Sequence, residues 1–428
     1  MRDDETPPQT PTGTLSPATP AIPRTDVPAP PAGPAPWLLR LVVVGLVLTA
    51  LNLRPAITSL GALLEEVRDG LHMSGSVAGV LTSVPPLCFA VFGITAPRLA
   101  RRFGAGAVVC AGMVAITAGL VIRPLIGGTA GFLAASALAL MGIAVSNVLM
   151  PVIVKRWFPD RVGSMTGLYS MALALGTSLA AAVTVPMTEA MGGSWKAGLG
   201  IWAVLAAAAI LPWIPLVRDR SGAPGQPSAR RAQAPELRIT RSRTAWALAC
   251  FFGLQATAAY ITMGWMPQIF RDAGVSAGTA GVLLAVTMAM GVPLAFVIPR
   301  VAARMRNQGA IVVFLGACGL VGYAGLYLAP SGGAWAWALL LGISNCAFPL
   351  ALTMIGMRSR SGAGVVRLSA FAQSTGYLIS IPGPLLVGVL YQHSGGWGLP
   401  IALMAALMVP QMAAGILAGR DRTIEDEC

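Results

Sequence analysis

The sequence predicts an all-α membrane protein with twelve transmembrane helices in two pseudo-symmetric six-helix bundles. Three observations predict this fold: the composition, the number of long apolar segments, and a repeat that relates the two halves of the chain. Of the 428 residues, 55% are hydrophobic and only 11% are charged, whereas a soluble globular protein carries about 25% charged residues. The mean hydropathy of +0.72 also indicates a polytopic membrane protein.

Apolar segments alternate with short polar loops, and each segment is long enough, at about 20 residues, to cross a bilayer as a helix. Residues 1–36 are rich in proline and predict a disordered tail, not a signal peptide. Residues 218–243 predict a linker between an N-terminal bundle, 37–217, and a C-terminal bundle, 244–419, before a tail at 420–428. The expected spans are 37–63, 76–97, 105–125, 129–154, 164–187, 197–217, 244–268, 278–299, 309–329, 334–357, 366–391 and 398–418.

The two halves repeat one another at an offset of about 200 residues. The individual matches are short, but they follow the same order in both halves. Two parallel six-helix repeats, with a site at their interface near the midplane, are typical of a secondary transporter. The matches are Ala78–Leu81 with Ala280–Leu283, Pro97-Arg98 with Pro299-Arg300, Ser146-Asn147 and Pro151 with Ser344-Asn345 and Pro349, and Gly61 and Arg68-Asp69 with Gly264 and Arg271-Asp272.

The basic residues predict the orientation in a bacterial cytoplasmic (inner) membrane. They gather in the loops that lead from an even-numbered span to the next odd-numbered span, here called the even-to-odd loops. Because basic residues are enriched on the cytoplasmic side, both termini and the linker should face the cytoplasm. This placement accounts for the net charge of +13 without nucleic-acid binding. The even-to-odd loops hold Arg98, Arg101, Arg102, Lys155, Arg156, Arg161, the linker arginines, Arg300, Arg304, Arg306, Arg358, Arg360 and Arg367. The opposite loops hold only Arg68, Arg123, Lys196 and Arg271.

Arg54 stands out because it is the only ionisable residue predicted near the centre of a span. An arginine at mid-membrane costs about 2.5–3.5 kcal/mol on insertion scales. Pro55 removes the N–H that would bond the Leu51 carbonyl, and it disfavours helical geometry at the preceding residue, Arg54. A broken helix with a lone charge is tolerated where it lines a cavity or packs in protein. The sequence therefore predicts a site at Arg54.

Other polar residues of the spans are candidate contacts around this site. Registering the halves on Gly61 and Gly264 places Asn52 opposite Gln255, and Asn147 matches Asn345. Asparagine in a membrane helix also bonds neighbouring helices, and that alternative stays open. The candidate substrate-binding residues are Arg54, Asn52, Thr58, Asn147, Gln255, Tyr260, Asn345, Gln373 and Tyr377.

Acidic residues are informative by their positions. All 16 fall in tails, loops or span ends, as do both histidines, so no embedded carboxylate is predicted as a proton relay. Arg54 consequently has no predicted internal counter-ion, which favours an anionic substrate. No nucleophile–base constellation, phosphate loop or metal-ligand spacing is present among the residues, so we expect neither an enzyme nor a cofactor or metal.

Several motifs carry a family resemblance. Asn52–Pro55, Ala96–Gly104, Ser146–Pro151 before Lys155-Arg156, Phe252–Gln255 and Gly395–Trp397 resemble the cyanate permease / 2-nitroimidazole transporter family of the major facilitator superfamily. The likeness covers about residues 40–418. It implies alternating access and transport of small solutes, cyanate being the named case. The gating loop, with Arg98, Arg101 and Arg102, departs from the wider superfamily, because Arg101 replaces the usual aspartate.

Three functions remain open at this stage. The first is transport of a small anion, such as cyanate or a carboxylate, with Arg54 as charge anchor. The second is export of nitroimidazole-like or other drugs, and the third is a membrane sensor that binds a ligand without moving it. The expected partners are a small-molecule substrate and the lipid bilayer, and the expected state is a monomer.

Overall fold

The computed structural model describes residues 36–217 and 238–427. The disorder predicted for residues 1–35 and for most of the linker lies outside these described residues. Within them the chain is helical, with twelve helices long and apolar enough to cross a membrane. Each of these helices overlaps one of the predicted spans, so the predicted membrane fold is confirmed.

Several spans consist of two helices in succession, and prolines stand at some of the breaks. α2 begins at Pro55 and α18 begins at Pro382, because proline favours the first helical turn and cannot bond to the turn before it. The first half contains α1 Pro36–Asn52, α2 Pro55–Ala62, α3 Leu64–Leu71, α4 Gly75–Phe103, α5 Ala105–Leu125, α6 Thr129–Trp157, α7 Val162–Ala190, α8 Trp195–Gly200, α9 Trp202–Ala208 and α10 Ile214–Val217. The second half contains α11 Arg243–Asp272, α12 Ala277–Ala289, α13 Gly291–Arg304, α14 Gly309–Leu328, α15 Ala334–Asn345, α16 Ala347–Met357, α17 Gly362–Ser380, α18 Pro382–Ser394 and α19 Gly398–Ala418.

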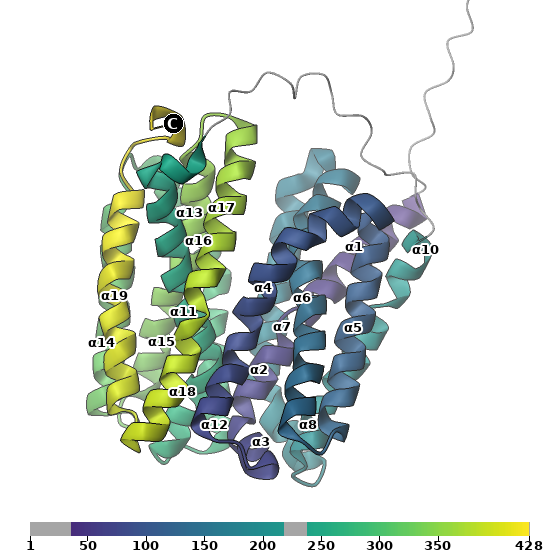
Figure 1. The fold of residues 1–428 in the computed structure, drawn as a ribbon, viewed down its shortest axis with the longest axis vertical. Helices are drawn as coiled ribbons and strands as arrows, with labels where there is room; N and C mark the ends of the chain where they lie inside the picture. Colours follow the sequence, from purple (N-terminus) through teal and green to yellow (C-terminus); the bar gives the residue numbers. More distant parts are fainter. Residues whose placement is uncertain (1–35, 218–237, 428) are drawn as a thin grey trace, which may run out of the picture.

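The two halves form two bundles side by side (Figure 1). We call the ends where α1 begins, α10 ends and α11 begins the linker face, and the opposite ends, which include α3, the far face. The bundles diverge toward the linker face and meet toward the far face (Figure 1). In the described residues, α4 packs on α17 and α18, α7 on α12, and α2 on α11.

Glycines permit the close contact between the bundles in their far-face halves. A β-carbon on Gly61 of α2 would overlap the Met263 carbonyl oxygen of α11. Gly61 and Gly264, which match in the sequence repeat, thus meet at the interface, where the Gly264 Cα is 3.4 Å from that same β-carbon position. Likewise a β-carbon on Gly281 of α12 would lie 2.5 Å from the Ala181 carbonyl oxygen of α7. Backbone therefore packs against backbone at these crossings.

The C-terminal residues dock on the linker face of the second bundle. Ile424, in the short helix η5 (Ile424–Asp426), is fully buried, and its N–H donates to the Arg358 carbonyl. Burial alone would raise the pKa of the Glu427 carboxyl, but hydrogen bonds from Ser242 and Thr244 hold it below its usual value. This segment ties the start of α11 to the end of α16.

Arg358, predicted as a loop residue, is only 2% exposed and donates to the carbonyls of Ala418 and Gly419. Burial lowers the pKa of this guanidinium. Its place at the C-terminus of α19 is favourable, because unpaired carbonyls give that end a partial negative charge.

Candidate functional site

The break in the first span is present as predicted. α1 ends at Asn52 and α2 starts at Pro55, with Arg54 as the N-cap residue at φ −125° and ψ −28°. The Arg54 carbonyl accepts the N–H groups of Ile57 and Thr58 at 2.9 and 3.1 Å and the Thr58 hydroxyl at 3.2 Å. The chain thus starts a new helix immediately after Arg54, and the backbone of Arg54 is held by that helix.

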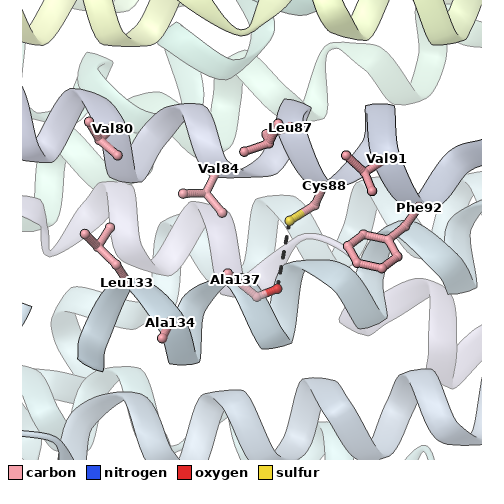
Figure 2. A pocket seen from close by; sticks show the side chains of 9 residues that line it. All are labelled: Val80, Val84, Leu87, Cys88, Val91, Phe92, Leu133, Ala134 and Ala137. Atoms are coloured by element: carbon pink, nitrogen blue, oxygen red, sulfur yellow. Dashed lines mark hydrogen bonds between the residues drawn. The ribbon is translucent and has the colours of Figure 1, made fainter. Parts of the chain in front are cut away.

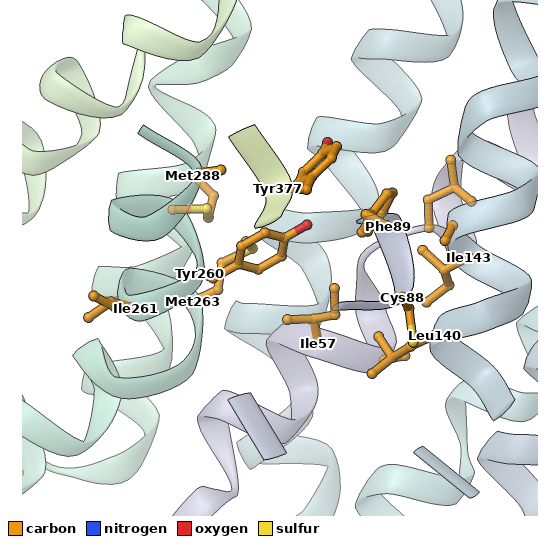
Figure 3. Close-up of a cluster of buried hydrophobic side chains, with 14 of the residues drawn as sticks. Ile57, Cys88, Phe89, Leu140, Ile143, Tyr260, Ile261, Met263, Met288 and Tyr377 are labelled. Atoms are coloured by element: carbon orange, nitrogen blue, oxygen red, sulfur yellow. The ribbon is translucent and has the colours of Figure 1, made fainter. Parts of the chain in front are cut away.

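The Arg54 side chain lies at the interface of the two bundles. Its guanidinium carbon is 5.8 Å from the centre of the Phe89 ring of α4. Tyr260 of α11 lies near enough to the guanidinium to interact with it electrostatically. Tyr377 of α17 stacks on Phe89 with ring centres 5.1 Å apart. Figure 3 shows Tyr260, Tyr377 and Phe89 converging from the two bundles. The structure therefore brings three of the predicted substrate-binding residues close together: Arg54, Tyr260 and Tyr377.

Apolar side chains complete the surroundings of this cluster. Ile57 and Cys88 of the first bundle and Met263 and Met288 of the second are buried in the same region (Figure 3). Arg54 itself is half-buried, and among the described residues no carboxylate pairs with it. The site consequently combines one positive charge and phenol hydroxyls with aromatic and aliphatic walls.

The N-terminus of α2 adds to the positive potential at Arg54. The first backbone N–H groups of a helix carry a partial positive charge, and a basic residue at that end is electrostatically unfavourable by itself. The N–H groups of Ile57 and Thr58 already bond the Arg54 carbonyl and Pro55 has none, so a small anion placed there would bind mainly to the guanidinium. The arrangement is chemically suited to anion binding.

Three other predicted residues bond to protein groups. Asn52, 2% exposed, donates to the carbonyls of Leu48 and Leu205 at 2.8 and 3.2 Å. Gln255 donates to the Asn345 backbone and side-chain oxygens at 3.0 and 2.8 Å, and it accepts from Gln411. These bonds correspond to the helix-to-helix alternative considered for such residues.

The remaining predicted residues are not brought into contact with Arg54. Asn147 is half-buried on α6, and Gln373 of α17 donates to the Ser369 hydroxyl at 2.6 Å. The gating-loop residues Arg98, Arg101 and Arg102 are exposed at the linker-face end of α4.

Many of the basic residues that we predicted in loops lie within helices, which corrects the sequence interpretation, and Arg123 and Arg271 are two of them. Arg123 is in the last turn of α5, is 1% exposed, and donates to the Ala56 carbonyl at 3.1 Å. Arg271 is in the last turn of α11. Sequence analysis also missed Phe89, because nothing in its sequence context separates it from other aromatic residues of the apolar segments.

Arg271 joins the bundles at the far face. Its two terminal nitrogens lie 2.7 Å from Glu65 and 2.9 Å from Glu66, both on α3 of the other bundle. The neighbouring Asp272 accepts the Tyr391 hydroxyl at 2.8 Å and the Trp397 indole N–H at 2.7 Å. The Arg271 ion pairs therefore join the two bundles at the far face, whereas the Asp272 hydrogen bonds lie within the second bundle.

We expect single neutralisation of Glu65, Glu66, Asp69 or Glu189 to glutamine or asparagine to leave substantial exchange activity. Arg271 has two carboxylate partners, so loss of one leaves the other, and exposed pairs contribute only about 0.2–1 kcal/mol each. Exchange in proteoliposomes measures the effect. Loss of exchange in any one of these variants while it remains folded would contradict the expectation that no membrane carboxylate is required.

A separate groove of about 470 Å³ lies on the outside of the first bundle, between α4 and α6 (Figure 2). Its lining is aliphatic and aromatic apart from the Cys88 thiol, whose sulfur is 3.9 Å from the Ala137 carbonyl oxygen. Leu87 and Val91 at its edge are about half exposed, as expected of side chains that face lipid. Because its lining has no charged side chain and only one weakly hydrogen-bonding thiol, this groove is unsuited to an ionic solute.

The fold and the interfacial site define a class of membrane transporter, and sequence comparison agrees. Residues 42–364 match the Major Facilitator Superfamily, so the chain belongs to this superfamily of transporters. An uncharacterized transporter YycB of Bacillus subtilis is 37% identical over 91% of this chain and 94% of its own. The 2-nitroimidazole transporter of Escherichia coli is 32% identical over 90% and 96%. The cyanate transport protein CynX of Escherichia coli is 30% identical over 86% and 94%.

Solved structures share the fold. The nucleoside transporter NupG superposes with a TM-score of 0.69 at 14% identity, covering 89% of this chain and 98% of its own. The xylose transporter XylE of Escherichia coli gives a TM-score of 0.69 at 10% identity, covering 89% and 95%. The resemblance to the cyanate permease / 2-nitroimidazole transporter family thus extends over most of the chain, and the protein is a multi-pass membrane transporter, not an enzyme.

Proposed function

We propose that the protein moves a small anion, such as cyanate or a carboxylate, by alternating access, with Arg54 as the charge anchor. One observation carries the proposal: a half-buried guanidinium sits at the bundle interface, at the positive end of α2, with no carboxylate partner among the described residues. A transported anion would supply the missing negative charge.

The chemistry of the cluster supports a small anion, and most directly a carboxylate. A guanidinium binds carboxylate-like groups through two parallel N–H···O bonds, which a lysine ammonium does not reproduce. The Tyr260 and Tyr377 hydroxyls can donate to the same ligand, and the Phe89 ring offers a flat wall. The low dielectric of such a site strengthens the attraction between opposite charges.

The arrangement of the bundles supports alternating access. Arg54 belongs to the first bundle and the two tyrosines to the second, so a ligand bound between them contacts both. The bundles meet at the far face and diverge toward the linker face (Figure 1). Rocking of one bundle against the other would expose the same site to the opposite side.

A second candidate function is export of a nitroimidazole-like drug. The apolar and aromatic surroundings of Arg54, with Phe89, Met263 and Met288, favour it, because flat heteroaromatic solutes stack on such walls. A relative bearing that function in its name is 32% identical.

Competition for uptake into proteoliposomes separates the two functions. Under the anion proposal, radiolabelled cyanate or a small carboxylate enters, and unlabelled small anions compete while cations of similar size do not. Uptake that responds only to neutral or cationic drugs would reject the anion proposal and favour the exporter.

For localisation, we propose that the monomer lies in the bacterial inner membrane with the linker face and both termini in the cytoplasm. A cysteine replacing the exposed Thr240, near the end of the predicted linker 218–243, should react with an impermeant maleimide only in inverted vesicles. Lys196→Cys on the far face is the matched control and should react in intact cells. The opposite pattern would refute this orientation.

A further inference from the structure

Arg123 is a fully buried cation outside the site at Arg54. It belongs to α5, away from the bundle interface, and is 1% exposed. One guanidinium nitrogen donates to the Ala56 carbonyl of α2. The guanidinium carbon lies 5.8 Å from the centre of the Phe132 ring on α6. The other two nitrogens, Nε and Nη2, are buried without a hydrogen-bond partner among the described residues.

Two buried hydroxyls in the neighbouring turns of the contacted helices are also without a partner. Ser59 follows Ala56 by three residues on α2, and Ser136 follows Phe132 by four on α6. Residues three or four apart share one face of a helix, so both serines lie on the faces that Arg123 contacts. Their hydroxyls are 0% and 1% exposed and unbonded within the described residues.

This group of residues has several donors and no negative charge. A buried guanidinium keeps its proton and carries a full positive charge, and burying an unpaired charge is strongly unfavourable. None of the ion pairs in the described residues involves Arg123. A water molecule could accept some of these hydrogen bonds, but it would leave the charge uncompensated.

We propose that Arg123, Ser59 and Ser136 form a second anion site, which holds a small resident inorganic anion such as chloride between α2, α5 and α6. The anion accepts from the free guanidinium nitrogens and the two hydroxyls and neutralises the buried charge. Because Arg123 also bonds the first turn of α2, the occupied site supports the helix whose N-terminus presents Arg54. This site is distinct from the transport site and does not depend on its substrate.

Thermal unfolding of the purified full-length protein tests the proposal, with chloride titrated against gluconate at constant ionic strength. The measurement uses the Arg54→Ala background, so that chloride at the transport site does not contribute. We expect chloride to raise the unfolding temperature with a saturable midpoint. Arg123→Gln should abolish this dependence, and Ser59→Ala or Ser136→Ala should raise the midpoint about tenfold, since each removes one hydrogen bond to a charged ligand.

Chloride-independent unfolding of the Arg54→Ala protein would overturn the proposal, as would chloride stabilisation that persists in Arg123→Gln. If Arg123→Gln fails to fold, the serine variants decide, because unchanged chloride midpoints in both would also overturn it. Bromide should replace chloride at a similar concentration, and a stabilisation that follows ionic strength alone counts against a built site.

Discussion

Arg54→Ala should reduce transport by at least about 100-fold, because it removes two or more hydrogen bonds to a charged ligand, each contributing about 1.5–3 kcal/mol. Arg54→Lys should reduce the transport rate by about tenfold or more, because lysine keeps the positive charge but cannot form the bidentate pair of hydrogen bonds. Both variants should fold, since the contacts that start α2 use the Arg54 backbone carbonyl, which any residue supplies. Initial uptake rates in proteoliposomes measure the loss.

Arg300→Ala is the matched control for this experiment. Arg300 is exposed on α13 and donates to the Phe296 carbonyl of its own helix, so its loss removes an arginine without touching the interface. Its transport should stay near the wild-type rate. Normal transport by Arg54→Ala, with the protein folded and inserted, would eliminate Arg54 as the charge anchor.

The features that the sequence predicted well are those governed by local chemistry. Proline has no N–H, so the break before Pro55 follows from one residue. Span positions follow from the length of the apolar segments, and the repeat of Gly61 and Gly264 marked two positions that meet at the bundle interface. Each of these depends on a few neighbouring residues or on a pattern in the chain.

The features that the sequence did not reveal depend on partners far away in the chain. Gln255 and Asn52 looked like cavity residues, but their hydrogen-bond partners, Asn345 and Leu205, are 90 and 153 positions distant. Arg123 near a span end resembled a loop residue, because neither composition nor spacing shows which helix covers it. Phe89 likewise acquires its place beside Arg54 only through the packing of α4 on α11 and α17.

Gly61→Val should strongly disfavour the conformation described here and slow transport. A β-carbon at position 61 would overlap the Met263 carbonyl oxygen across the interface, and backbone cannot rotate away as a flexible side chain can. Overpacking typically costs about 1–3 kcal/mol, which corresponds to a shift of about 5- to 150-fold in the balance between two conformations. The strain exists only while the far face is closed, so the variant should favour conformations in which the far face is open.

Gly278→Val is the control, because the same β-branched residue would meet open space on α12. Spin labels on the exposed far-face residues Lys196 and Ser331, one in each bundle, report the separation of the bundles there. We expect longer distances and slower transport in Gly61→Val, and wild-type distances and rates in Gly278→Val. Since replacing glycine by valine favours helix formation modestly at both positions, slower transport and longer distances in Gly61→Val alone point to the crossing of α2 and α11. Wild-type distances in Gly61→Val would show that α2 can shift along α11 without opening the far face, and that this glycine is not required for closure.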